Sequence, residues 1–220
     1  GAISTNNVQL AVSRSLFSGN RAQFRADADG GAVFVTMLDQ PNATVAFASS
    51  QFLANSAAGN GGGLAIAGAS SHIESCQFEL NTADDSGLNS RGGALLLQGG
   101  TQTTIQDCGF VLNQARAVFH SGGHNAQGGA LFANATLLTL KTSKFRSNRA
   151  IESVGGGQGG ACMLAHLAPG STVSEVIMEL NCAESGDSGG QGGAVLVYAS
   201  AITFANSQFV SVVSSHKSNL

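Results

Sequence analysis

The sequence predicts an all-β fold, a single β-solenoid of about six to seven coils, each with roughly 30–36 residues and three short strands. Two observations predict it. Two short motifs alternate along almost the whole chain at a nearly fixed period, and the segments between them have the composition of strands. Repeats of 20–50 residues are typical of solenoids and other repeat architectures.

The first motif is a pair of glycines followed by a short apolar stretch. Its copies begin at Gly30, Gly62, Gly92, Gly128, Gly159 and Gly192. Glycine is favoured where the backbone takes a positive φ or where two backbone segments approach too closely for a Cβ. We therefore expect each pair to mark a corner of a coil.

The second motif is F-x-x-N-x-A. Its Phe/Asn pairs are Phe17/Asn20, Phe52/Asn55, Phe78/Asn81, Phe110/Asn113 and Phe145/Asn148, followed by Met178/Asn181, where Met replaces Phe. A seventh copy at Phe209 has Val212 in the Asn position. In a stack of coils the rings form one inner column. The Asn amides can bond the backbone at a second corner, and each other along the axis.

The three strands of a coil follow from these motifs. One strand follows the Gly pair, a second carries an apolar residue five positions before the aromatic residue, and the third carries Ser/Cys-x-Phe. The apolar runs are short and lie between Gly, Ser, Asn and Asp residues, which is typical of strands. Glycine in a helix interior costs about 1 kcal/mol relative to alanine, so helical repeats are excluded. Gln127, Gln158 and Gln191 precede three successive Gly pairs and predict a further column of amides.

The alternation of G-G-A-[I/L/V] with F-x-x-N resembles the repeat of the chlamydial polymorphic membrane proteins over residues 10–212. The departures are Leu64 in an Ala position, Met178 in a Phe position and Val212 in an Asn position. The resemblance implies a right-handed, single-stranded parallel β-helix, similar in architecture to pectin-lyase-like proteins. It also implies a surface module that mediates adhesion.

Composition excludes several classes of function. The chain has 220 residues, a formal net charge of −3 and no basic run, which argues against nucleic-acid binding. No apolar run reaches the roughly 18–20 residues of a membrane span. We expect residues 1–220 to be one β-helix domain and a piece of a longer chain, with residues 211–220 as a Ser-rich C-terminal tail.

The cysteines allow two interpretations. Cys76 and Cys108 share the small-residue position two before the aromatic residue in adjacent coils, so they either replace Ser in the core or form a disulfide. Cys162 and Cys182 lie in different columns of one coil. They could pair only if a corner brings their Cα atoms within about 7 Å.

Two sequons, at Asn42 and Asn134, are possible glycosylation sites.

Glycoside hydrolysis, the chemistry of many β-helix enzymes that act on polysaccharides, requires two suitably spaced carboxylates. Asp84 and Asp85 are the only weak candidates. We expect them in a loop after the F-x-x-N corner, where solvated carboxylates explain them better than catalysis does. Asp27 and Asp29 are likewise interpreted as loop acids. We therefore expect no catalytic residue, no cofactor and no metal site.

The strand after each Gly pair is apolar on both of its alternating faces, as Val33 and Val35 with Phe34 illustrate. A strand with one side in water would alternate with polar residues. We expect its outer face to be covered, either by the chain's own loops or by a protein partner or another copy.

Together these features predict a non-enzymatic, extracellular structural or adhesive module that acts through its solenoid faces in surface assembly or adhesion. Its partners would be proteins, copies of itself or cell-surface glycans. The alternative is a carbohydrate-active β-helix resembling polysaccharide lyases or hydrolases, or a glycan-binding β-helix.

Overall fold

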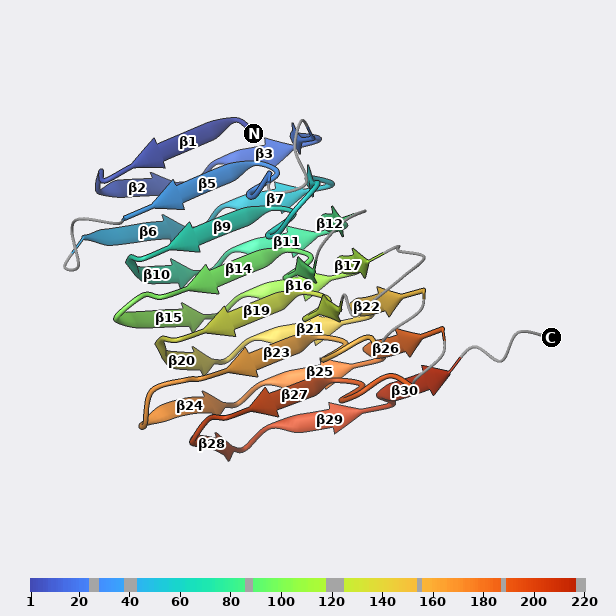
Figure 1. The fold of residues 1–220 in the computed structure, drawn as a ribbon. Helices are drawn as coiled ribbons and strands as arrows, with labels where there is room; N and C mark the ends of the chain where they lie inside the picture. The colour runs from blue at the N-terminus through green and yellow to red at the C-terminus, as the bar shows by residue number, and fades with distance from the viewer. Residues whose placement is uncertain are drawn as a thin grey trace.

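The computed structural model describes residues 1–23, 28–37, 43–85, 89–117, 125–153, 156–186 and 189–216. In these ranges the structure consists of β-strands, turns and bends, with no helix. The coils stack along one axis from the N-terminus to the C-terminus (Figure 1). This confirms the predicted all-β solenoid, in which each strand pairs with the equivalent strand of the next coil in parallel.

Four seven-stranded sheets run the length of the stack. Sheet A contains β1 (Ile3–Asn6), β5 (Val33–Thr36), β9 (Leu64–Ala67), β14 (Leu95–Gln98), β19 (Leu131–Asn134), β23 (Cys162–Ala165) and β27 (Val195–Tyr198). Sheet B contains β2 (Leu10–Ser13), β6 (Thr44–Ala48), β10 (Ser70–Glu74), β15 (Gln102–Gln106), β20 (Leu137–Lys141), β24 (Ser171–Ser174) and β28 (Ile202–Ala205).

Sheets C and D complete each coil. Sheet C contains β3 (Leu16–Ser18), β7 (Gln51–Leu53), β11 (Gln77–Glu79), β16 (Gly109–Val111), β21 (Lys144–Arg146), β25 (Ile177–Glu179) and β29 (Gln208–Val210). Sheet D contains β4 (Arg21–Ala22), β8 (Ser56–Ala57), β12 (Thr82–Asp85), β17 (Gln114–Ala117), β22 (Arg149–Glu152), β26 (Cys182–Ser185) and β30 (Val213–His216). A small fifth sheet pairs β13 (Ser90–Arg91) with β18 (Ala126–Gln127).

Sheets A, B and C correspond to the three predicted strands of each coil, and sheet D adds a fourth. Its strands begin directly after the Asn of F-x-x-N-x-A, and the Ala of this motif points inward and is buried from Ala57 to Ala183. The last of these strands, β30, lies in the segment expected to be a Ser-rich tail and pairs with β26.

The in-register pairing places each recurring residue type in one column. Phe78 pairs with Phe52 and Phe110 in sheet C, and Ile73 pairs with Phe47 and Ile105 in sheet B. These inward columns confirm the register expected from the two motifs.

One Gly pair begins one residue earlier than expected. Leu64 pairs with Val33 and with Leu95, so Gly61 and Gly62 form the second pair and Gly63 takes the Ala position. Gly61 has a φ of +61°, and the first glycine of each other pair has a φ between +60° and +65°. The run of three glycines made the register ambiguous in the sequence, and stacking against the neighbouring coils resolves it.

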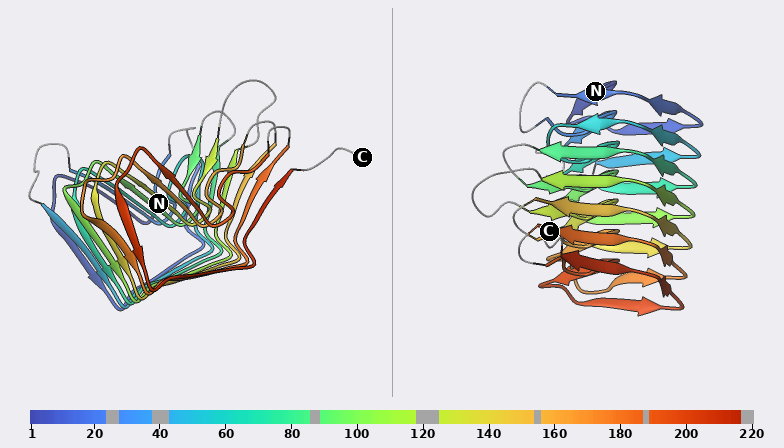
Figure 2. Two further views of the ribbon diagram at one scale, coloured as in Figure 1. Left: turned by 90° about the horizontal axis from the view of Figure 1, so that it is seen from below. Right: turned by 90° about the vertical axis from the view of Figure 1, so that its right-hand side faces the viewer.

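Sheets A, B and C enclose the main core, while sheet D extends away from the corner where sheet C ends (Figure 2, left). The core contains Phe52, Phe78, Phe110 and Phe145, all fully buried. Burying each such ring contributes about 1.5–3 kcal/mol.

The corners require unusual backbone conformations from ordinary residues. The residue before each Asn of the motif has a positive φ, for example Leu80 at +57° and Leu112 at +56°. The Asn itself does not. A left-handed conformation costs a non-glycine residue about 1–2 kcal/mol, so the hydrogen bonds between stacked coils must hold it in place.

Candidate functional surfaces

The Asn column is a continuous chain of hydrogen bonds through the core. Asn113 Nδ2 donates to Asn148 Oδ1 at 3.0 Å and to the carbonyl oxygen of Phe78 in the preceding coil at 2.9 Å. Its Oδ1 accepts from the backbone N–H and from Nδ2 of Asn81, both at 3.0 Å. Side-chain bonds of this kind link Asn20, Asn55, Asn81, Asn113, Asn148 and Asn181. The predicted amide column is thereby confirmed.

The Phe column runs parallel to it. Ring centroids of successive Phe residues from Phe17 to Phe145 are 4.4–4.9 Å apart, and the ring planes are nearly parallel, with interplanar angles of 2–13°. Met178 continues the column and pairs in register with Phe145 and with Phe209. These two columns connect each coil to the next through side-chain hydrogen bonds and stacked rings.

A third column precedes the Gly pairs. Gln127 Nε2 donates to Gln158 Oε1 at 2.8 Å, as predicted. The column also extends toward the N-terminus, which the sequence analysis missed: Arg91 Nε donates to Gln127 Oε1, and Asn60 Nδ2 donates to Asp29 Oδ1. In every coil the residue directly before the Gly pair has a side chain that can form hydrogen bonds. Because this residue changes from Asp to Asn, Arg and Gln along the chain, the sequence does not show the column as a repeated residue type.

The outer face of sheet A is largely covered within the chain itself. Ala65, Leu96, Phe132 and Met163 form a second buried cluster, against which Phe34 and Leu196 pack. The guanidinium of Arg91 lies over the Phe132 ring, 5.3 Å from its centroid. The chain's own segments bury these outward apolar side chains of sheet A. Their apolar character is thereby explained without a partner.

The outer face of sheet B carries a different pattern. Thr104, Thr139, Thr172 and Thr203 pair in register, one above the other, on the side facing away from the core. Their side chains range from half-buried to exposed. We call this row the threonine column. It was missed although each Thr directly precedes the inward apolar residue of its strand.

A shallow groove extends the threonine column toward the N-terminus. Its volume is about 340 Å³, and its lining includes Thr44, Ser70, His72, Gln102 and Thr104. Hydroxyl, amide and imidazole groups in such a groove can donate and accept hydrogen bonds.

The C-terminal coil leaves core-type side chains exposed at the end of the stack. Phe209 is 45% exposed and Phe204 is 39% exposed, whereas equivalent residues of the inner coils are fully buried. A cavity of about 460 Å³ lies here, lined by Gly192, Gly193, Ala194, Val195, Val197, Phe204, Phe209 and Val212.

The weak catalytic candidates occupy a strand, not the expected loop. Asp84 and Asp85 are the last residues of β12, because sheet D begins directly after the Asn. Asp84 is paired in register with Arg116, and their charged groups form a solvent-exposed ion pair at 3.9 Å. A second pair joins Arg149 Nε to Glu184 Oε1 at 2.8 Å, with the Glu184 side chain nearly buried.

Of the two sequons, only that of Asn134 lies within the described residues. Asn42 lies outside the described residues. Asn134 ends β19 and is half-buried, and Thr136 of its sequon is 2% exposed. Glycosylation of either residue stays a prediction.

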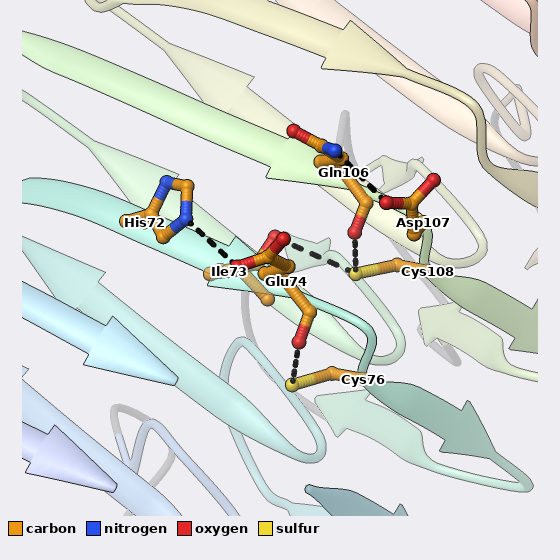
Figure 3. A network of polar contacts seen from close by, with 7 residues as sticks. All are labelled: His72, Ile73, Glu74, Cys76, Gln106, Asp107 and Cys108. Atoms are coloured by element: carbon orange, nitrogen blue, oxygen red, sulfur yellow. Dashed lines mark hydrogen bonds and ion pairs between the residues drawn. The ribbon is translucent and has the colours of Figure 1, made fainter. Parts of the chain in front are cut away.

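All four cysteines are thiols in the structure. Cys162 belongs to the main core, and burial raises the pKa of its thiol. Cys182 in sheet D instead lies 3.9 Å from the Ser215 hydroxyl. Cys76 and Cys108 occupy the same corner of adjacent coils, and their thiols point to the same side (Figure 3).

Cys76 and Cys108 replace serine without changing its local hydrogen bonds. Ser50 Oγ donates to the carbonyl oxygen two residues before it, at 2.9 Å. Cys76 Sγ donates in the same way to Glu74 at 3.3 Å, and Cys108 Sγ to Gln106 at 3.1 Å (Figure 3). The interpretation of these cysteines as core substitutes for Ser fits this geometry.

Over the residues that the structure describes, no group of three or more His, Cys, Asp or Glu side chains is placed to hold a metal ion. His72 on the outer face of sheet B lies 3.4 Å from Glu74. The same residues include no helix that could cross a membrane.

No family model matches this chain, and neither a curated protein nor a solved structure proves significantly similar to it.

Proposed function

We propose that this chain is a non-enzymatic structural or adhesive module of an extracellular surface, which contacts its partners through the outer face of sheet B. The observation that carries the proposal is the threonine column. Its four hydroxyl-bearing side chains are stacked on one flat face at the spacing of parallel strands, about 4.8 Å. A partner whose polar groups recur at a similar spacing can form hydrogen bonds with several coils at once.

The buried Asn and Phe columns also support this proposal. The Asn and Phe columns fix each coil relative to the next, so the threonine column is held in one arrangement before a partner arrives. Preorganisation of this kind lowers the entropic cost of binding. The resemblance of the repeat to that of chlamydial polymorphic membrane proteins, whose known members are adhesive, points the same way.

A binding assay with charge variants tests the proposal. Purified chain would be applied to the cell-surface material of its source, with Thr139→Glu/Thr172→Glu as the test variant. Gln51→Glu/Gln77→Glu is the matched control, because these residues are exposed on the outer face of sheet C. We expect the test variant to lose binding and the control to retain it. Equal binding by both variants, or no binding by the unchanged chain, would contradict the proposal.

The groove beside His72 favours a second candidate, a glycan-binding function. Its hydroxyl, amide and imidazole groups match the hydroxyl groups of a sugar. A glycan array probed with the unchanged chain and with His72→Ala tests it, since only the unchanged chain should retain signal. A lyase or hydrolase would instead release products from a polysaccharide and lose that activity in Asp84→Ala.

A further inference from the structure

The small-residue column contains two stacked cysteines in a corner otherwise occupied mainly by serine. The other members are Ser15, Ser50, Ser143, Val176 and Ser207. Cys76 is in the third coil and Cys108 in the fourth, each directly before a strand of sheet C. No other two described cysteines share a column.

The backbone brings the two residues to a separation that a disulfide can bridge. Gly109 N–H donates to the carbonyl oxygen of Cys76 at 3.0 Å, and Gln77 pairs in register with Gly109. Adjacent strands lie about 4.7–4.9 Å apart, and disulfides usually join Cα atoms about 4.4–6.8 Å apart.

The Cys108 thiol is also directed toward the coil of Cys76. Cys108 Sγ reaches the carbonyl oxygen of Ile73 in the third coil at 3.6 Å, which shows that this thiol leans toward the coil of Cys76 (Figure 3). Contact between the thiols lowers the pKa of Cys76 and raises that of Cys108.

We propose that Cys76 and Cys108 form a cross-linking site, in which reaction with a small-molecule disulfide joins the third and fourth coils through a disulfide bond. The thiolate of one of these cysteines attacks one sulfur of the oxidant, giving a mixed disulfide and releasing one thiolate. The thiolate of the other cysteine then attacks the protein sulfur of this mixed disulfide and releases the second thiolate. Two protein thiols are oxidised, one disulfide is reduced, and the two protons end on the released thiols.

Burial determines when the reaction occurs. Cys76 is 0% exposed and Cys108 is 3% exposed, so an oxidant cannot reach either sulfur in the closed stack. The exchange takes place while the fourth coil is still open, and the closed stack then protects the bond from reductants. Oxidation during folding should consequently be much faster than oxidation of the folded, reduced chain.

The test is to refold the reduced chain in a mixture of reduced and oxidised glutathione, then alkylate the remaining thiols under denaturing conditions. We expect two alkylated thiols per chain. Trypsin cleaves after Arg25, Arg91 and Arg116, so peptides 26–91 and 92–116 should stay linked until a reductant is added. Refolding with reduced glutathione alone should give four alkylated thiols.

Three variants separate this cross-link from other pairings. Cys76→Ser and Cys108→Ser should fold, because serine occupies this column in four other coils, and neither should give the linked peptides. Cys182→Ser is the control and should still give them. Thermal unfolding of the oxidised chain should occur several degrees higher than that of the reduced chain, with no such difference in Cys76→Ser. Four alkylated thiols after oxidative refolding, or a link between Cys162 and Cys182 alone, would overturn the proposal.

Discussion

Asn113 and Asn148 occupy the same corner of adjacent coils, and Asn113 Nδ2 donates a 3.0 Å hydrogen bond to Asn148 Oδ1. Both residues are fully buried. Each buried polar atom of this column is paired with the coil before or after it. The column can therefore stabilise the corners in which Leu80 and Leu112 have positive φ values.

Removing one amide should destabilise several coils. Asn113→Ala would leave the carbonyl oxygen of Phe78 and the amide groups of Asn81 without their partners. Each unsatisfied buried group costs about 1–3 kcal/mol, so we expect a loss of about 3 kcal/mol or more in urea unfolding. The exposed Gln51→Ala in sheet C is the control and should change stability by less than about 0.5 kcal/mol. Equal effects would show that the amide column contributes nothing.

The Phe column should tolerate methionine better than alanine. Phe110 lies between Phe78 and Phe145, with centroid distances of 4.9 and 4.4 Å. Phe110→Ala leaves a cavity and should cost about 3–5 kcal/mol. Phe110→Met should cost less than about 1.5 kcal/mol, because Met178 already occupies the equivalent position two coils later. Thermal denaturation would compare them, and a Met variant as unstable as the Ala variant would refute this expectation.

Gly129 should be required because a side chain there has no room, whereas Gly99 should be required because its backbone φ is positive. A Cβ at Gly129 would overlap the carbonyl oxygen of Gly160, whereas Gly99 has a φ of +68° and no atom within 4 Å of an added Cβ. Gly129→Ala should cost about 3 kcal/mol or more, since two backbone segments must separate. Gly99→Ala should cost only about 1–2 kcal/mol, the strain of a left-handed alanine. The reverse order of unfolding midpoints would argue against the coil spacing described here.

Extending the Asn column should stabilise the last coil. Val212 stands in the Asn position of the seventh F-x-x-N copy, so the column ends at Asn181. Val212→Asn would offer an Oδ1 to the N–H and Nδ2 of Asn181, and we expect about 1 kcal/mol of added stability. Val212→Ala is the control and should give no gain. Amide hydrogen exchange in β26 and β30 would measure the effect, with slower exchange expected only in the Asn variant.

The columns could be predicted from the sequence because each is made of one residue type that the core selects. Phe52, Phe78 and Phe110 recur because each coil has the same position in the core to fill. Each Asn follows its Phe by three residues in the sequence. Sheet D was not predicted, since its one recurring inward residue is a small Ala and its outward residues vary from Arg116 to Glu184.

Other features depend on tertiary contacts that no local pattern reveals. Leu80 and Leu112 have no intrinsic preference for a positive φ, and the stacked coils impose it. The threonine column became visible only when in-register pairing placed Thr104, Thr139 and Thr172 side by side. The covering of Phe132 depends on Arg91, which lies 41 residues earlier in the chain.

Electron microscopy of the native surface material, with an antibody against this chain as label, tests the central claim most directly. The proposed structural or adhesive role predicts label within an ordered surface layer or filament, with the outer face of sheet B at the contact. Label on isolated, unattached rods, together with release of sugar products from a polysaccharide by the purified chain, would contradict it.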